Sequence, residues 1–438
     1  MIKARSELVQ ISVPEEEQPY EVPKNWRWFT VGSINSYQSK NIDPSENPEK
    51  EYELYSVPSS EYDYPELVLG REIGSTKADV KKGDVLLCKI NPRINRVWIV
   101  SKHTDRALLA SSEWIIIRNE KIQSDYLMCC FRSPYFRQYM LSNVSGVGGS
   151  LMRAQPKFVS KYPVPIPPFP EQQRIVDRIE RLFDKLDEAK EKAQAVVDGF
   201  EDRKAAILHQ AFTGELTAEW RRINNVSSGS WTYEPLENVF TIKSGTTIPT
   251  DEEKESGIIP YIKVADMNIP GNEVCIVTSS RFVDSCPIRQ IIPKGSTIFP
   301  KRGGAILTNK KRYVEVSRII ADLNVMGIIP KQEYIDGWYG YYWMLSIDLR
   351  EINNGSNVPQ INNKDMVKLL VPTPSINEQK KIVSVLKQWF LKETQAKEAA
   401  EQVTSQIDTM KKAILARAFR GELGTNDPTE PPADIGIS

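Results

Sequence analysis

The chain has 438 residues, with 57 basic and 57 acidic side chains and therefore no net charge when its two histidines are neutral. This length exceeds what one compact core usually holds, so two domains with connecting elements are expected. No apolar run approaches about 18 residues and no signal-peptide pattern is present, which excludes membrane-spanning and secreted classes and predicts a cytoplasmic protein.

Residues 1–163 are predicted to form a first domain of short strands and turns. It opens with a tryptophan-containing segment, PKNWRWFTVGSI, at 23–34. The β-rich runs that follow are separated by Gly, Pro, Asn and Asp, as is typical of strands joined by turns. Strands are expected at 84–90, 96–100 and 112–118, and a helix at 126–141.

The next segment, residues 164–216, is repeated at 371–423 with a constant offset of 207 positions. VPIPPFPEQQRIV matches VPTPSINEQKKIV, and KAAILHQAFTGEL matches KKAILARAFRGEL, with 16 of these 26 positions identical. Unrelated segments would share roughly one or two. A different, longer sequence precedes each copy, which indicates a chain built for two related tasks.

Each copy predicts a long amphipathic helix. Apolar residues recur with a 4-3-4-3 spacing over 175–207 and 382–414, which is the seam of a coiled coil. Arg203 and Glu393 are the exceptions. Two helices packed on separate cores are the alternative, but the matched seams favour mutual packing.

The ends and lengths of these helices predict their direction. Gly214 and Gly421 stand where a left-handed residue would end each helix. About 40 residues rise roughly 60 Å, whereas the linker expected at 217–228 reaches at most about 40 Å. The second helix is therefore expected to return antiparallel to the first, with one domain at each end and approximate two-fold symmetry.

Residues 229–370 are predicted to form a second domain of the same kind. It opens with GSWTYEPLENVF, and its expected strands lie at 257–264, 296–301 and 312–320, with a helix at 340–350. After the second repeat, the acidic residues 424–438 are rich in Pro, Gly and Asp and are predicted to be disordered.

Catalytic signals are weak. No Gly-Lys dipeptide occurs, which excludes a P-loop, and residues 146–151 lack the last glycine of a dinucleotide-binding loop. The tetrads Asn-Pro-Pro-Tyr and Asp-Pro-Pro-Tyr of amino-methyltransferases are absent. Five cysteines without a C-x-x-C pair predict reduced thiols and no zinc. The run Asp251, Glu252, Glu253 and Lys254 resembles nuclease acid spacing, but a solvated loop is the favoured interpretation.

Two basic runs invite a DNA-binding interpretation, because Lys and Arg neutralise phosphates while Arg, Asn and Lys can also read base edges. Each run follows a matching phrase, KGDVL at 82–86 and KGSTI at 294–298, so the two domains are expected to place these loops equivalently. A charged surface turn is the alternative. The candidates are Lys89, Asn91, Arg93, Asn95 and Arg96 in the first domain, and Lys243, Lys263, Lys301, Arg302, Asn309, Lys310, Lys311 and Arg312 in the second.

Taken together, several short motifs resemble the specificity subunit of type I restriction–modification systems. These are a P-x-x-W opening, a proline run leading into Glu-Gln, and a helix that ends in A-F-x-G-E-L. They are carried by Pro23 and Trp26; Pro165, Pro167, Glu171 and Gln172; Ala211, Phe212, Gly214, Glu215 and Leu216, followed by TAEWR at 217–221; and, in the second copy, Pro372, Pro374, Glu378, Gln379, Ala418, Phe419, Gly421, Glu422 and Leu423. Residues 229–231 depart from the P-x-x-W opening.

The resemblance implies an α+β chain in which two α/β target recognition domains, separated by a long antiparallel two-helix coiled coil, each read one half of an asymmetric bipartite DNA target. The helices would dock two methylation subunits, which act on adenine with S-adenosylmethionine. Restriction subunits would supply ATP- and Mg-dependent translocation and cleavage. The chain itself is expected to be non-catalytic and to bind no cofactor and no membrane. An autonomous metal-dependent nuclease and a coiled-coil scaffold without DNA readout stay as alternatives.

Overall fold

The computed structural model describes residues 12–142, 144–145, 152–227, 229–352 and 359–435. The chain divides into two compact units: unit 1 comprises Met1–Ala193 and Gln402–Ser438, and unit 2 comprises Gln194–Glu401. The carboxyl-terminal part of the chain therefore folds with the amino-terminal domain. Residues 146–151, the partial cofactor-loop pattern, lie outside the described residues.

Unit 1 contains a five-stranded sheet in the order β2-β5-β8-β3-β4, a three-stranded sheet β7-β6-β9, and the antiparallel pairs β1-β12 and β10-β11. Its strands are β1 (Arg27–Thr30), β2 (Asn41–Ile42), β3 (Glu51–Tyr55), β4 (Glu66–Leu69), β5 (Lys77–Asp79), β6 (Val85–Cys88), β7 (Val97–Ile99), β8 (Ala107–Ala110), β9 (Trp114–Ile117), β10 (Val144–Ser145), β11 (Arg153–Ala154) and β12 (Pro163–Ile166). Its helices are α2 (Val31–Ile34), α3 (Ser124–Phe131), α4 (Pro134–Ser142), α5 (Pro156–Val159) and most of α6 (Phe169–Asp198).

The three strands expected at 84–90, 96–100 and 112–118 correspond to β6, β7 and β9. The single helix expected at 126–141 is instead two helices, α3 and α4. Pro134 is the first residue of α4. Proline lacks the N–H that would continue the preceding helix, but it fits the first turn of a new one.

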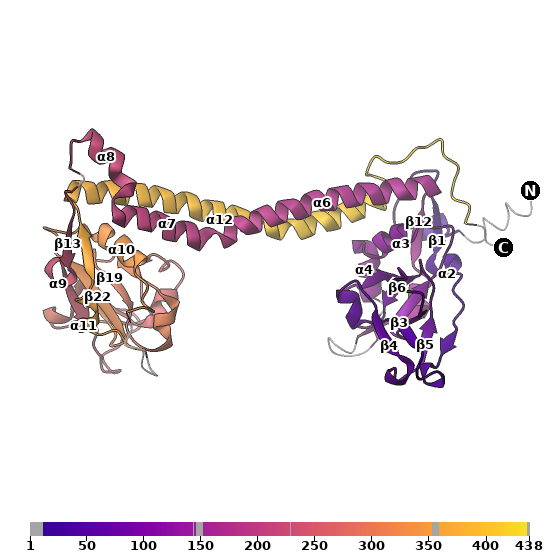
Figure 1. Cartoon of the computed structure of the whole chain (residues 1–438), viewed down its shortest axis with the longest axis horizontal. Helices are drawn as coiled ribbons and strands as arrows, with labels where there is room; N and C mark the ends of the chain where they lie inside the picture. The colour runs from indigo at the N-terminus through magenta and orange to yellow at the C-terminus, as the bar shows by residue number, and fades with distance from the viewer. Residues whose placement is uncertain (1–11, 143, 146–151, 228, 353–358, 436–438) are drawn as a thin grey trace, which may run out of the picture. The chain divides into compact units, whose positions relative to one another are not determined.

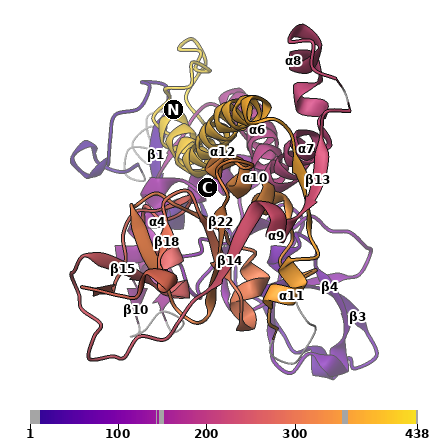
Figure 2. The same cartoon turned by 90° about the vertical axis from the view of Figure 1, so that its left-hand side faces the viewer.

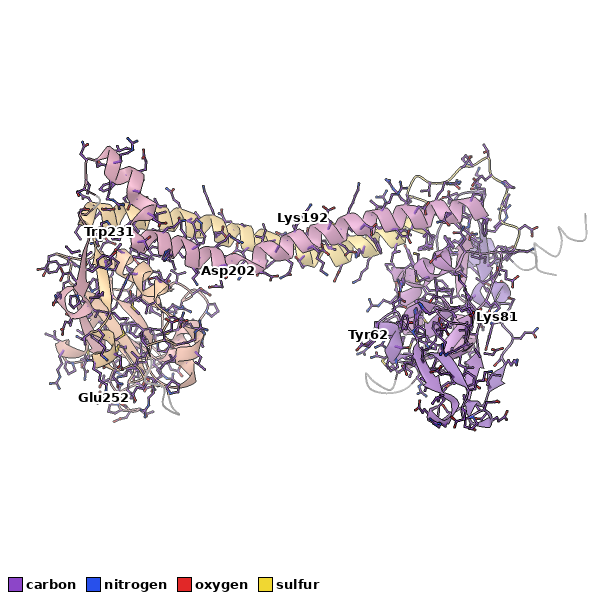
Figure 3. All side chains as sticks on the ribbon, in the orientation of Figure 1. Tyr62, Lys81, Lys192, Asp202, Trp231 and Glu252 are labelled. Carbon is purple, nitrogen blue, oxygen red and sulfur yellow. The ribbon has the colours of Figure 1, made fainter. Side chains whose placement is uncertain are left out.

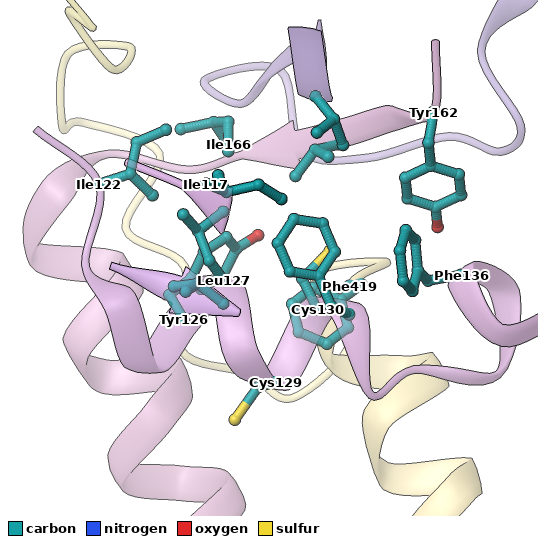
Figure 4. Packing of buried hydrophobic residues seen from close by; sticks show 14 of the residues in the cluster. Ile117, Ile122, Tyr126, Leu127, Cys129, Cys130, Phe136, Tyr162, Ile166 and Phe419 are labelled. Atoms are coloured by element: carbon teal, nitrogen blue, oxygen red, sulfur yellow. The ribbon is translucent and has the colours of Figure 1, made fainter. Parts of the chain in front are cut away.

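The core of unit 1 includes the end of the second repeat. Phe419, just beyond the end of α12 (Ile376–Ala418), is 1% exposed and lies among Tyr126, Cys130 and Phe136 of the first domain (Figure 4). The rings of Phe419 and Tyr126 meet edge to face with centroids 5.4 Å apart. Burial of an aromatic ring is worth several kcal/mol, so this contact ties the carboxyl end of α12 to the first domain.

Within unit 1 the two repeat helices run antiparallel. The Nζ atom of Lys411 lies 2.6 Å from Asp187 Oδ1, and that of Lys190 lies 3.8 Å from Asp408 Oδ1, so positions later in α12 meet positions earlier in α6. Figure 1 shows the two ribbons side by side in this unit. The antiparallel direction predicted from the sequence is therefore present in this pair.

Unit 2 contains a five-stranded sheet β14-β22-β19-β20-β16, a four-stranded sheet β17-β15-β21-β18, and the pair β13-β23. In Figure 2, where this unit faces the viewer, β14 and β22 run side by side below α10. Its strands are β13 (Thr232–Pro235), β14 (Phe240–Ser244), β15 (Ile259–Ile262), β16 (Cys275–Ile276), β17 (Phe282–Val283), β18 (Ile292–Pro293), β19 (Thr297–Pro300), β20 (Arg312–Val314), β21 (Arg318–Ala321), β22 (Val325–Pro330) and β23 (Leu370–Thr373). Its helices are α7 (Phe200–Thr213), α8 (Ala218–Ile223), α9 (Leu236–Val239), α10 (Gly337–Ser346), α11 (Asn363–Met366) and the first part of α12.

The strand expected at 312–320 is in fact two strands, β20 and β21, which belong to different sheets. The helix expected at 340–350 is α10, which begins three residues earlier because Asp336 caps it by accepting hydrogen bonds from the N–H groups of Trp338 and Tyr339.

The first repeat is two helices where the sequence predicted one. Gly199 separates α6 from α7, and glycine is a poor helix former. The two residues that interrupt the apolar seams, Arg203 and Glu393, form an ion pair in unit 2. Arg203 Nε and Nη2 lie 3.0 and 2.9 Å from Glu393 Oε2. Arg203 Nη2 also donates to the carbonyl oxygen of Val196 at 2.8 Å. Gly214 and Gly421 have φ of 87° and 74°, which confirms both as left-handed residues at the helix ends.

The predicted linker and the predicted disordered tail both contain buried residues. Residues 217–228 begin with a buried Thr217 at the end of a 3-10 turn (Glu215–Thr217), followed by α8 with a buried Arg221. The predicted disorder of the tail is wrong through Ile435, which is 4% exposed in the core of unit 1. The tail is held by long-range bonds, such as that from Trp26 Nε1 to Asn426 Oδ1 at 3.2 Å.

Candidate nucleic-acid interface

The two basic runs occupy the same place in their respective domains. Residues 89–96 connect the antiparallel strands β6 and β7, and residues 301–311 connect the antiparallel strands β19 and β20. A glycine with φ near 90° precedes each hairpin. The N–H of Gly83 donates to the carbonyl oxygen of Val100, just after β7, at 2.8 Å, and the N–H of Gly295 donates to the carbonyl oxygen of Val314, in β20, at 3.0 Å. The equivalence expected from the KGDVL and KGSTI phrases is therefore present in the fold.

Hydrogen bonds hold the first loop against the rest of its domain. Asn91 and Asn95 have φ of 47° and 53°, the left-handed region in which asparagine is the most tolerated non-glycine residue. Asn95 Nδ2 donates to Phe131 O at 3.0 Å, and Arg137 Nη2 donates to Arg93 O at 2.5 Å. These bonds fix the loop to the α3–α4 region. The Asn95 amide group is therefore already engaged in holding the loop, which makes it a positioning residue.

The cationic side chains of the first loop differ in exposure and in whether they already form an ion pair. Arg93 is exposed, and Lys89 is half-buried. Arg96 is 2.8 Å from Glu61 at the end of a neighbouring 3-10 turn (Pro58–Glu61). Tyr62 follows Glu61 directly and is 82% exposed at the surface of unit 1 (Figure 3). Aromatic side chains can stack on bases, so Tyr62 joins Arg93 as a surface group of this region.

Three further cationic residues lie near the first loop and were not among the candidates predicted from the sequence. Arg132 and Arg137 of the α3–α4 region and Lys412 of α12 line a cleft of about 440 Å³, together with Ile94 and Asn95. Arg132 Nη2 donates to Val97 O at 2.9 Å, which holds its guanidinium beside β7. The residues are distant in sequence, and only the packing of α12 on the first domain brings them together. A cleft with three cations and no acidic lining residue suits a phosphate group.

The second loop is anchored from both sides. Its middle forms a 3-10 turn (Gly303–Thr308), and Asn309 follows with φ of 51°. Asn309 Oδ1 accepts hydrogen bonds from Leu349 N at 2.9 Å and from Lys311 Nζ at 2.6 Å. Asn95 ties the first hairpin to the last residue of α3, and Asn309 ties the second hairpin to the segment just after α10, so Asn309 also positions its loop.

Lys311 and Arg312 are part of the fold. Lys311 is 2% exposed, and its ammonium group donates to Asn309 Oδ1 at 2.6 Å and to Ile347 O at 2.5 Å. Burial lowers the pKa of Lys311 to about 7. Arg312 Nη2 donates to Met267 O at 2.9 Å, and burial lowers its pKa. The assignment of these two residues to phosphate contacts does not fit the structure, because their donors point into the protein.

The other candidates of the second domain fall into two groups. Lys243 Nζ donates to Ile291 O at 2.9 Å, and Lys263 Nζ lies 2.7 Å from Glu253 Oε2. Both therefore stabilise local structure. Arg302 is exposed, whereas Lys301 and Lys310 are half-buried and Lys310 also bonds to Asn268. Lys301, Arg302 and Lys310 are the candidates at this hairpin whose charge can reach a phosphate.

The acidic run at 251–254 does not assemble a metal site. Glu253 faces Lys263, and Lys254 forms an ion pair with Asp284. Glu252 lies at the end of the unit 2 domain opposite to α7 and α12 (Figure 3). Across the described parts of the chain, no group of three or more His, Cys, Asp or Glu side chains is placed to hold a metal ion.

Comparison with known proteins agrees with this architecture. Residues 23–197 and 229–403 each match the family model of the type I restriction modification DNA specificity domain. The chain belongs to this family. The two matched segments each take in one domain and most of the helix that follows it.

Individual relatives are distant. The chain is 21% identical over 336 residues to the EcoKI specificity subunit of Escherichia coli (strain K12), covering 72% of this chain and 69% of that protein. It is 27% identical over 236 residues to the EcoAI specificity subunit of Escherichia coli, covering 51% of this chain and only 39% of that protein. The HsdS subunit from Thermoanaerobacter tengcongensis has a TM-score of 0.72 at 20% identity, covering 93% of this chain and 99% of that chain, so the fold is shared. Among the helices of the described residues, none is both long and apolar enough to cross a membrane.

Proposed function

We propose that this chain is the specificity subunit of a type I restriction–modification complex. Its two recognition domains each read one half of an asymmetric, bipartite DNA sequence. The chain supplies sequence recognition and assembly, and its partner subunits supply the chemistry.

One observation carries this proposal: the family match occurs twice, and each copy holds a basic hairpin in the same topological position with different side chains. Equivalent scaffolds with unlike loops suit two related but different DNA sequences. Cationic groups around each loop, such as Arg93 in the first and Arg302 in the second, provide the phosphate attraction that all DNA binding requires. The different loop sequences give each half of the target its own base contacts.

The helices α6, α7 and α12 are proposed to dock two methylation subunits. These partners would bring S-adenosylmethionine to the target adenines, and restriction subunits would bring ATP and Mg. The chain would act in the cytoplasm, where the host DNA is found. The specificity subunits that it resembles are named as components of type I restriction enzymes, and the same role is proposed for this chain.

Methylome sequencing tests the proposal. A host expressing the chain with its methylation subunit should show adenine methylation at a split motif whose two halves differ. The methylation subunit expressed alone is the control and should leave no such motif. A continuous motif, a symmetric motif or no motif would contradict the proposal. Cleavage of DNA by the purified chain with magnesium alone would favour the nuclease alternative instead.

A further inference from the structure

Each basic hairpin exposes one large aliphatic side chain among its cations. In the first loop Ile94 is 52% exposed, and in the second loop Leu307 is 59% exposed. Ile94 directly precedes Asn95, and Leu307 lies two residues before Asn309, the two left-handed asparagines that anchor the loops. The same chemical feature therefore recurs close to the anchoring asparagine in two domains whose loop sequences are otherwise different.

The backbone holds both side chains outward. In the first loop, Ile94 N donates to Asn91 O at 3.0 Å and Asn95 N donates to Pro92 O at 3.1 Å, so the turn around Ile94 is closed. In the second, Leu307 belongs to the 3-10 turn Gly303–Thr308, and Asn309 N donates to Ile306 O at 3.0 Å. Ile306, its neighbour, is fully buried, so the turn directs one aliphatic residue into the core and the next to the surface.

The surroundings of Ile94 distinguish it from an ordinary exposed aliphatic residue. Single exposed apolar side chains are common on protein surfaces. Ile94, however, lines two clefts, one of about 440 Å³ with Arg132, Arg137 and Lys412, and a smaller one of about 230 Å³ with Arg132 and the Arg96–Glu61 ion pair. An apolar side chain at the edge of the larger, cationic cleft lies beside any phosphate that this cleft holds, where it can also contact a base of the same nucleic acid.

We propose that Ile94 and Leu307 are specificity-determining residues that make apolar contact with DNA bases, one in each half of the target. This inference rests on the proposed function. The flanking cations hold the phosphate backbone, while the aliphatic tip meets either the 5-methyl group of a thymine or the face of an unstacked base. Both are apolar surfaces of bases, and the DNA sequence determines where each of them is available.

The test uses the chain assembled with its methylation subunits and duplexes that carry the motif found by methylome sequencing. Ile94→Ala should weaken binding to the cognate duplex by about tenfold and leave binding to unrelated duplex unchanged. Leu307→Ala should do the same through the other half of the motif. Leu67→Ala and Ile223→Ala remove exposed aliphatic side chains elsewhere, on β4 of unit 1 and α8 of unit 2, and should have no effect.

Modified duplexes distinguish the two base surfaces. If the contact is with a thymine methyl group, replacing one thymine of the half-site by uracil weakens wild-type binding, and the same replacement has no further effect on the alanine variant. If the contact is with an unstacked base, 2-aminopurine at that step brightens on binding wild type and stays dark with the variant. Unchanged cognate affinity in both alanine variants overturns the inference while leaving the proposed function intact. Failure of the wild-type complex to bind any motif overturns the proposed function itself.

Discussion

The salt dependence of DNA binding tests how the second hairpin uses its charge. Five cationic side chains lie between residues 301 and 312, but the structure leaves only Lys301, Arg302 and Lys310 placed for phosphate contact, since Lys311 and Arg312 donate into the protein. Each phosphate neutralised contributes about 0.9 to the slope of log affinity against log salt. Replacing Lys301, Arg302 and Lys310 together by alanine should therefore lower that slope by about 2.7.

The expected change in the salt slope is large enough to measure. Between 50 and 200 mM salt, a slope difference of about 2.7 means that wild type loses about 40-fold more affinity than the triple variant. Titration of a labelled target duplex with the assembled complex across this range measures it. Lys311→Met is the matched control and should leave the slope unchanged, because its charge is buried. An unaltered slope in a folded triple variant, or a lowered slope in Lys311→Met, would refute the division of these five cations into phosphate-contacting and structural residues.

Three further predictions concern stability. Because burial lowers the pKa of Lys311 to about 7 from the usual 10.5, the unfolded chain binds more protons than the folded chain between these two pH values. Stability should therefore rise with pH from about 7 to about 10.5, and Lys311→Met should flatten this rise in urea unfolding. Phe419→Ala should cost unit 1 about 3–5 kcal/mol, seen as faster amide exchange around Tyr126, whereas Phe419→Leu should cost much less. Deleting residues 424–438 removes the buried Ile435 and the partner of the Trp26 indole, and should destabilise unit 1 by at least about 2 kcal/mol; an unchanged melting temperature would show that the tail contributes nothing.

Local signals in the sequence predicted the parts of the fold that local chemistry determines. The hairpin strands β6, β7 and β19 follow from short β-rich runs bounded by turn residues, and the helix ends at Gly214 and Gly421 follow from the left-handed conformation that glycine adopts. The pairing of the repeat helices followed from their shared seam. The two residues that interrupt this seam, Arg203 and Glu393, form an ion pair in unit 2. The sequence alone showed two interruptions of the seam and did not show that they pair.

Features that depend on distant residues could not be predicted. Lysine is rarely buried, so a run of cations at 301–312 gave no sign that Lys311 holds the end of α10. The cleft beside Ile94 needs Lys412, more than 300 positions away, and this lysine appeared only as part of a repeat helix. The tail has the composition of a disordered segment, and its order comes from partners such as Trp26 that belong to the other end of the chain.

A glutamate that occurs in both repeats links the start of each repeat to the segment that follows the other repeat. Glu171 and Glu378 occupy the same position in the two repeats, and both side chains are fully buried. Glu378 accepts a hydrogen bond at 2.7 Å from the hydroxyl of Thr217, in the segment that follows the first repeat, and Glu171 accepts one at 2.7 Å from Thr425, in the segment that follows the second.

In both units an arginine completes the site, Arg221 for Glu378 and Arg174 for Glu171. The Glu378–Arg221 pair is buried, and removing one partner of a buried ion pair leaves an uncompensated charge, which costs about 3–5 kcal/mol. The Arg174 side chain is more exposed, so its removal should cost less. Each unit thus fastens the beginning of one repeat to the end of the other through a buried carboxylate. Because this fastening uses only residues in and next to the repeats, the hairpins that we propose to bind DNA are free to differ between the two domains, which is what two unlike half-targets require.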